Sequence, residues 1–465
     1  MALEKDSEIA ELTESGKNIA QDVVEQILST LPPKSLMRFK CVSKWWYHLI
    51  TSPRFVAKHL SISKHNRPST CALIKSLVSN DAEAQEPEMV FSLLNFSYEN
   101  DNNAGGALST NLSSVEDLTI PTRVVESLRI IGHCDGIVCL ALIDYQQRLA
   151  KPSQVCLWNP AIQQFKFLPE EPFLPDWSKV PHSRMVQEFA YLRPISLLNG
   201  ETMGFGYDPK SKDYKVIDIG FSDSKFYGDP ECYGGHVIVY PPKAVVYTLQ
   251  TDSWREIKTF SLERETSYLW PDTFQLYLKG VCYWLGYEQQ KEFLCLFQTH
   301  QEEEERIARA IISFDTSDEV FHDIMLPHGL LEFYGFDNFL TLHLTEWNES
   351  VALFSLLFED EHKATMWVMD AKGAWTKQLT FEYVDYFPYS LPRKILAFWK
   401  SNEIFGVGEN GSIVCYNLNT KIVKHLPIRS VPDYFPPSRD TFYPFCCIAY
   451  VNSVVPIMNH VREHI

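Results

Sequence analysis

A hairpin pattern that recurs over most of the chain constrains the fold more than any other feature. Each unit has an apolar strand, a turn that starts with Asn, Asp or Thr, and a second strand with a bulky residue five or six positions later. The six units are Trp158-Asn159 with Phe165, Tyr207-Asp208 with Tyr214, Tyr247-Thr248 with Trp254, Phe314-Asp315 with Phe321, Met369-Asp370 with Trp375, and Tyr416-Asn417 with Val423. Self-similarity of this kind is typical of repeat architectures.

The spacing of these turns favours a β-propeller. They lie 49, 40, 67, 55 and 47 residues apart, near the roughly 40 to 50 residues of one blade, and the turns at 208 and 248 can share a blade. The final apolar run, residues 445–456, is expected to close the ring by pairing with a strand within residues 69–94. The sequence therefore predicts an α+β multidomain chain whose larger domain is an all-β, kelch-like propeller, with an orthogonal β-sandwich as the alternative.

Before residue 62 the apolar pattern has a helical period instead. Steps of three and four predict a first helix that Pro32 and Pro33 terminate, and a second helical pattern follows. Ser52 and Pro53 are typical of the N-cap and first turn of a third helix. The apolar residues of the first two patterns are Ile19, Val23, Val24, Ile27, Leu28 and Leu31, then Leu36, Phe39, Val42, Trp46, Leu49 and Ile50. Because three short helices bury too little surface to be stable alone, we expect them to contact another polypeptide or the C-terminal body.

The net charge of −17 is unevenly distributed. Residues 26–80 contain nine Lys or Arg residues and no Asp or Glu, which leaves −26 for the remainder. Since nucleic-acid binding requires a positive surface, the net charge argues against a nucleic-acid partner. The asymmetry predicts that the helices meet an acidic partner and that the body attracts a basic one. The alternative is that the Lys and Arg side chains form only a solvated surface.

Cysteine use and hydropathy indicate the compartment. Eleven Cys residues are scattered without CxxC spacing, which favours reduced, buried thiols over disulfides or a metal site. No apolar run reaches the roughly 18 residues of a membrane span, and residues 1–17 lack the pattern of a signal peptide. We therefore expect a cytoplasmic, and also nuclear, protein with no membrane partner, no cofactor and no metal.

The sequence offers little support for catalysis. His133-Cys134-Asp135 are consecutive residues, which cannot form a triad, and Asp135-Gly136 is typical of a tight turn. The string Gly204-Phe205-Gly206 lacks the third glycine of a dinucleotide motif and lies in a strand pattern. The sequence contains no nucleophile elbow and no phosphate-binding loop motif. A non-catalytic protein is therefore the expectation.

The helical region resembles the F-box of plant proteins. The similarity covers residues 27–50 and continues through Ser52-Pro53-Arg54-Phe55, although Ile19-Ala20 stand where the family usually has Leu-Pro. It implies an F-box over residues 17–62, behind a disordered tail at 1–16, that binds a Skp-type adaptor and through it a cullin and a RING protein. The resemblance implies adaptor contacts or F-box core positions for Val24, Ile27, Leu28, Leu31, Pro32, Leu36, Val42, Trp46 and Leu49.

Residues 69–455 resemble the F-box-associated domain, particularly that of S-locus F-box proteins. The similarity rests on Gly132-His133-Cys134-Asp135-Gly136-Ile137-Val138, Trp158-Asn159-Pro160, Gly204-Phe205-Gly206-Tyr207-Asp208, Asp213-Tyr214-Lys215-Val216, Val246-Tyr247, Ser253-Trp254-Arg255 and Trp367-Val368-Met369. It implies the substrate-recognition subunit of an SCF-type E3 ubiquitin ligase, which binds a protein for ubiquitination and proteasomal degradation.

The resemblance leaves the target open. The S-locus type implies a pollen component of self-incompatibility that recognises pistil ribonucleases (S-RNases), whereas other members of the family have other targets, including immune receptors. A propeller enzyme or binding module with a decayed F-box is the alternative from a different class. Long loops on rigid scaffolds usually carry recognition, so the insertions at residues 171–194, 221–242 and 302–305 are expected to form the target-binding rim.

Overall fold

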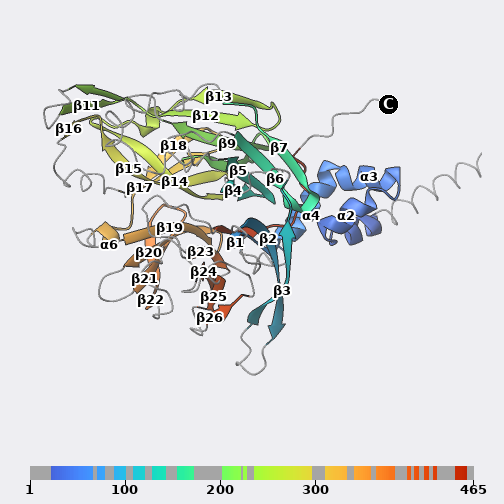
Figure 1. The fold of residues 1–465 in the computed structure, drawn as a ribbon. Helices are drawn as coiled ribbons and strands as arrows, with labels where there is room; N and C mark the ends of the chain where they lie inside the picture. The colour runs from blue at the N-terminus through green and yellow to red at the C-terminus, as the bar shows by residue number, and fades with distance from the viewer. Residues whose placement is uncertain are drawn as a thin grey trace, which may run out of the picture.

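The structure is a computed structural model of the 465-residue chain. The described residues are 22–65, 71–78, 88–100, 108–120, 128–142, 154–171, 202–220, 224–227, 235–295, 309–331, 340–357, 363–382, 395–399, 403–407, 413–417, 423–426 and 446–457. The first four helical stretches and the sheets that follow them account for most of these residues (Figure 1).

The N-terminal region contains four helical stretches where the sequence pattern predicted three. They are residues 22–28, α2 (Pro33–Phe39), α3 (Lys44–Thr51) and α4 (Pro53–His65). The second predicted helix is interrupted because Ser43 is extended and its hydroxyl accepts the Trp46 backbone N–H at 3.2 Å, which starts a new helix. Ser52 caps α4, as the sequence predicted: its hydroxyl accepts the Phe55 backbone N–H at 3.2 Å.

The rest of the described chain is a six-bladed β-propeller, and each blade is a four-stranded antiparallel sheet. Blade 1 consists of β27 (Cys446–Tyr450), β1 (Cys71–Val78), β2 (Glu88–Asn100) and β3 (Leu108–Leu118). Blade 2 has β4 (Leu128–Cys134), β5 (Ile137–Leu142), β6 (Gln154–Asn159) and β7 (Gln164–Phe167). Blade 3 has β8 (Gly204–Asp208), β9 (Asp213–Gly220), β12 (Lys243–Thr248) and β13 (Ser253–Ile257).

The remaining blades follow the same order. Blade 4 has β14 (Ser267–Leu278), β15 (Val281–Gln290), β17 (Arg309–Asp315) and β18 (Val320–Ile324). Blade 5 has β19 (Leu340–Trp347), β20 (Ser350–Leu357), β21 (Lys363–Met369) and β22 (Trp375–Glu382). Blade 6 has β23 (Ile395–Trp399), β24 (Glu403–Val407), β25 (Ile413–Asn417) and β26 (Val423–His425). The sandwich alternative is therefore wrong.

All six hairpins predicted from the sequence are present. The bulky residue of each second strand is the direct cross-strand partner of the aromatic or Met residue before the turn, as in Trp158 with Phe165 and Phe314 with Phe321. Such cross-strand pairs stabilise antiparallel sheets and fix their register. The hairpins at 208 and 248 share blade 3, as expected.

The ring closes as predicted, between the two ends of the chain. The C-terminal β27 pairs with the N-terminal β1 in register from Cys71 opposite Tyr450 to Lys75 opposite Cys446. Blade 1 is therefore assembled from sequence segments about 370 residues apart. The C-terminal segment thus supplies one edge strand of blade 1, and its pairing with β1 closes the ring.

A smaller sheet adds to the propeller. It is composed of β10 (Ser224–Tyr227), β11 (Gly235–Val239) and β16 (Glu292–Cys295), in the order β10-β11-β16. The insertion at residues 221–242, predicted as a loop, therefore contains two strands that pair with each other, and β11 also pairs with β16, which follows β15. The other two insertions, 171–194 except for its first residue and 302–305, lie outside the described residues.

Glycines on the first strands of blades 2 and 3 leave room for aromatic side chains of blade 4. A Cβ on Gly132 of β4 would lie 2.7 Å from the ring of Phe274 in β14, and one on Gly204 of β8 would lie 2.4 Å from the Trp284 ring. The string Gly204-Phe205-Gly206 is thus a closely packed strand, as the sequence indicated. Where these residues lie, strands β4, β8 and β14 of blades 2, 3 and 4 are closely packed against one another.

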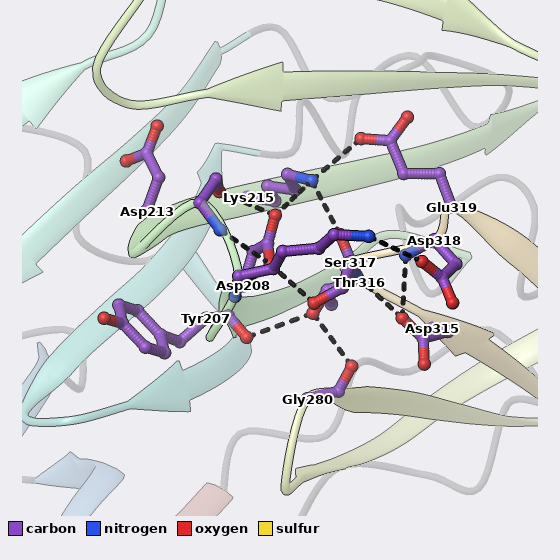
Figure 2. A network of polar contacts seen from close by, with 12 residues as sticks. Tyr207, Asp208, Asp213, Lys215, Gly280, Asp315, Thr316, Ser317, Asp318 and Glu319 are labelled. Carbon is purple, nitrogen blue, oxygen red and sulfur yellow. Dashed lines mark hydrogen bonds and ion pairs between the residues drawn. The ribbon is translucent and has the colours of Figure 1, made fainter.

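A buried ion-pair network joins blades 3 and 4 (Figure 2). The Lys215 ammonium lies 2.8 Å from a carboxylate oxygen of Asp208 and 2.8 Å from one of Glu319, and it donates to the Thr316 carbonyl at 2.6 Å. Asp208 also accepts the hydroxyls of Ser211 and Ser317, both at 2.6 Å. Burial raises the pKa of Asp208, but these donors outweigh burial and hold the pKa well below its ordinary value.

Candidate protein-binding surfaces

The helical region has a small hydrophobic core that the far end of the chain completes. Leu28, Leu36, Ile50 and Phe55 are each at most 2% exposed, and Val454, which follows β27, packs among them at 3% exposure. The turn at η2 (Pro160–Ile162) of blade 2 packs against α2. One side of the helices is therefore anchored to the propeller, which is the arrangement expected if the body covers them.

The helices also expose large apolar side chains to solvent. Val23, Ile27, Val42, Trp45 and Tyr47 are 54%, 57%, 62%, 39% and 36% exposed. Leaving such side chains in water costs about 25 cal/mol for each Å² of apolar area, and aromatic side chains dominate the energetics of protein interfaces. This surface has the character of a protein-binding site.

The residues implied by the F-box resemblance divide into three groups. Leu28 and Leu36 are buried, so they serve the helical core and are not accessible in the isolated chain. Ile27, Pro32 and Val42 are exposed, and Val42 lies in the break before α3. The half-buried members, at the border between core and surface, are Val24, Leu31, Trp46 and Leu49.

Most of the cations of residues 26–80 bind within the chain. Lys58 and Arg54 lie 3.2 and 3.8 Å from the buried Glu25 carboxylate, and Lys34 pairs with Glu116 of β3 at 2.9 Å. Lys64 pairs with Asp135, and Lys75 donates to the Leu128 carbonyl. Two of these ion pairs, those of Lys34 and Lys64, therefore connect the helices to acidic residues of the propeller.

Three cations around the α2–α3 connection have no ion pair among the described residues. They are Arg38, Lys40 and Lys44, and they flank the exposed Val42 and Trp45. We call these five residues the α2–α3 patch. An apolar centre with a basic rim fits a partner whose surface is apolar and acidic.

The tight turns of the blades lie at the same end of the propeller as the helices. The Asp135-Gly136 turn between β4 and β5 contacts α4 through Lys64, and η2 lies between β6 and β7. Because successive strands are antiparallel, the connections from second to third strand and from blade to blade lie at the opposite end. The strands that flank the three insertions predicted to form the target-binding rim end or begin on that side, and Figure 1 shows β11 and β16 far from α2 and α3.

The His133-Cys134-Asp135 string has no catalytic geometry. Burial raises the pKa of the Cys134 thiol well above its ordinary value, with a further increase from the charge of Asp135, so the thiol stays protonated. Burial also lowers the pKa of His133 to about 4, against a smaller opposing effect of Asp135. Asp135 itself binds Lys64 and the Tyr214 hydroxyl. These groups are held by structural contacts.

Metal-binding clusters and membrane spans are both absent from the described residues. Within them, no group of three or more His, Cys, Asp or Glu side chains is placed to hold a metal ion. The helices of the described part of the chain are all too short or too polar to cross a bilayer.

Family comparisons agree with this architecture. Residues 18–58 match the F-box domain, and residues 93–457 match the F-box associated beta propeller domain. The fold and the exposed helical surface thus define an F-box joined to a propeller. The chain belongs to the F-box associated β-propeller family.

Curated relatives are F-box proteins of Arabidopsis thaliana. At3g10430 is 24% identical over 304 residues, which cover 64% of each chain. At1g47790 is 24% identical over 350 residues, which cover 74% of this chain and 69% of the relative. The F-box/kelch-repeat protein At3g23880 is 28% identical over 209 residues, or 44% of this chain and 46% of the relative. The chain therefore spans just under two thirds of the first of these relatives.

Likeness to solved structures is weaker. Apo AztD from Citrobacter koseri covers 83% of this chain and 100% of its own, with 10% identity and a TM-score of 0.30. That score is too low to support an argument, so the assignment rests on the family matches and on the sheet order.

Proposed function

We propose that this protein is the substrate-recognition subunit of an SCF-type ubiquitin ligase. The helices bind a Skp-type adaptor, which brings a cullin and a RING protein, and the propeller binds the protein to be ubiquitinated. The ubiquitin chemistry belongs to the partner enzymes. A receptor of this kind acts in the cytoplasm or the nucleus.

One observation carries this proposal. The helical core is closed on one side by Val454 of the protein's own C-terminal segment, while the other side leaves Ile27, Val42 and Trp45 exposed. Helices that only packed on the propeller would have no reason to keep this second apolar surface in water. An adaptor accounts for the exposed side, and intramolecular packing accounts for the buried one.

Binding of the purified full chain to a Skp-type adaptor tests the part of the proposal that concerns the helices. The double variant Val42→Ala/Trp45→Ala should weaken binding at least about tenfold, because anchors at an interface commonly contribute more than about 1.4 kcal/mol. Phe260→Ala is the matched control, since Phe260 is 76% exposed on the propeller and should not affect the affinity. Leu36→Ala is unsuitable alone, because Leu36 is fully buried and its truncation would unfold the helices.

An unchanged affinity of the double variant, with the helices still folded by circular dichroism, would contradict this placement of the adaptor. The basic rim gives a second measurement. Arg38→Glu/Lys44→Glu should slow association and reduce its dependence on salt, since rim charges act mainly on the association rate.

The target-binding end is proposed to be the end opposite the helices. Its long insertions depart from strand ends that face away from α4, so adaptor and target do not compete for one surface. Exchange of residues 171–194, 221–242 and 302–305 for those of a relative should change target choice. If targets are unchanged after all three exchanges, the target binds elsewhere on the propeller.

For the target itself, we propose a basic protein, with a pistil S-RNase as the specific candidate. The support is the charge of −26 that remains outside residues 26–80, together with the resemblance to S-locus F-box proteins. Pull-down against a panel of S-RNases and immune receptors, repeated at rising salt, separates the candidates. If the protein captures an immune receptor in preference to every ribonuclease, the S-RNase proposal is wrong and the immune receptor takes its place.

A further inference from the structure

A single turn holds the adaptor-binding helices, two blades and the C-terminal segment together. The Asp135 side chain is 6% exposed, and one of its oxygens pairs with the Lys64 ammonium at the end of α4. The other oxygen accepts the Tyr214 hydroxyl of blade 3 at 3.0 Å. The backbone carbonyl of Asp135 accepts the hydroxyl of Ser453, which is 318 residues away in the sequence.

The C-terminal segment, residues 451–457, is fixed at the same place. The Asn159 amide donates to the carbonyls of Ser453 at 3.3 Å and Val455 at 2.8 Å. The Tyr450 hydroxyl lies 3.1 Å from the Gly136 carbonyl and donates to it. Val454, between these anchored residues, inserts into the helical core. The segment thus lies between the helices and blade 2 and contacts both.

Burial distinguishes this junction from the other ion pair between helices and propeller. Lys34 and Glu116 are 66% and 50% exposed, and such surface pairs contribute little because water and salt screen them. Asp135 is buried, so loss of Lys64 leaves a carboxylate without a counterion in a site of low polarity, which is strongly unfavourable. An ion pair with a buried carboxylate and fixed hydrogen bonds can select one arrangement of its partners even where it adds little stability.

We propose that Asp135 is a positioning residue, whose contacts with Lys64, Tyr214 and Ser453 hold the adaptor-binding helices in one orientation relative to the propeller. The helices and the target-binding end then move as one body. The consequence for ubiquitin transfer rests on the proposed function: a fixed orientation presents the same part of the target to the ligase in each complex.

The orientation can be measured in the full chain without reference to any partner. Two spin labels, introduced as non-natural amino acids at the exposed positions His48 and Phe260, report the distance between helices and propeller. The parent protein should show one narrow distance distribution. Asp135→Asn should broaden it or add a second distance, because Asn tolerates the left-handed backbone of this turn (φ 56°) but cannot pair with Lys64.

Matched variants separate positioning from general damage. Lys64→Gln should broaden the distribution as Asp135→Asn does, Lys64→Arg should restore the narrow one, and Lys34→Gln should leave it unchanged. Hydrogen exchange in α4 should rise at least about tenfold in Asp135→Asn and Lys64→Gln, while exchange in blades 4 and 5 stays the same.

A narrow, unshifted distribution in both Asp135→Asn and Lys64→Gln would overturn the proposal. If Asp135→Asn fails to fold, Lys64→Gln still decides, because its side chain is 46% exposed and lies outside the turn. Adaptor affinity should be equal in all these variants, since the α2–α3 patch is untouched. Absence of adaptor binding by the parent protein would instead reject the proposed function and leave the orientation result standing.

Discussion

Two glycines with nearly the same φ angle have very different surroundings. Gly136 has φ 85° and Gly373 has φ 83°, so each occupies a region that other residues enter at a cost of about 1–2 kcal/mol. A Cβ at Gly136 would lie 2.5 Å from the Val451 carbonyl and 2.5 Å from the Ser453 hydroxyl, whereas one at Gly373 would meet nothing within 4 Å. Their comparison separates backbone strain from crowding.

We expect Gly136→Ala to lower the free energy of unfolding by about 3 kcal/mol or more, and Gly373→Ala by only about 1 kcal/mol. The difference arises because a methyl group added at Gly136 would displace the C-terminal segment. Denaturant unfolding of both variants, with the slope of the transition checked for each, measures it. Equal losses would mean that the C-terminal segment moves away without cost.

At the scale of elements, the Lys215 network joins blades 3 and 4 through buried charged side chains. Lys215 and Asp208 are 6% and 3% exposed. Burial raises the pKa of Glu319, but the contacts with Arg255 and Lys215 lower this pKa by more. Both carboxyl groups therefore have pKa values below those of the unfolded chain, about 3.9 for Asp and 4.3 for Glu. Their stabilisation is present in full above those values and is lost as the pH falls through the folded-state pKa values.

Unfolding free energy should accordingly decrease as the pH falls below about 4.5, and Lys215→Met should flatten that decrease. The same variant should be less stable at pH 7 by about 3–5 kcal/mol, because it leaves two carboxylates without their shared counterion. Lys210→Gln is the control, since Lys210 and Asp318 form an exposed pair beside the network and should not alter the pH dependence. A pH profile of Lys215→Met identical to that of the parent would mean that other carboxylates govern acid unfolding.

The sequence predicts elements whose causes are local. Trp158 with Phe165 is a local pair across a short turn, so the hairpin can be identified from spacing alone. The extra helix break before Lys44 was missed, because the apolar spacing through Val42 continues unbroken and only the Ser43 cap reveals the interruption. The strands at 224–227 and 235–239 were also missed: they pair with each other, and only the second of them pairs with β16, which lies more than 50 residues further along the chain.

In the candidate site, too, the sequence predicts the local features and misses the long-range contacts. The resemblance assigned residues to the helices but did not separate the exposed Ile27 and Val42 from the buried Leu28 and Leu36, because their burial depends on the distant Val454. Asp135-Gly136 was identified as a turn, yet its contacts with Lys64 and Ser453 leave no trace in local spacing. Long-range contacts of this kind require the folded ring.

At the scale of the whole molecule, the last residues of the described chain belong to both halves. β27 completes blade 1, and Val454 completes the helical core a few residues later. Closure of the ring and folding of the helices are therefore coupled through one short segment. Blade 1 can be completed only after β27 has been synthesised, about 370 residues after β1.

Two C-terminal variants separate these roles. Val454→Ala should keep the ring closed but cost about 2 kcal/mol, because it removes buried methyl groups from the helical core, and helical signal should be lost before the sheets unfold. Truncation after residue 445 should remove both contacts and abolish a single cooperative transition, whereas truncation after residue 457 should preserve it. Circular dichroism and hydrogen exchange across α2–α4 and blade 1 measure the outcome. If Val454→Ala lowers the hydrogen-exchange protection of blade 1 as much as that of the helices, the helices and the propeller unfold as one unit, which would contradict this prediction.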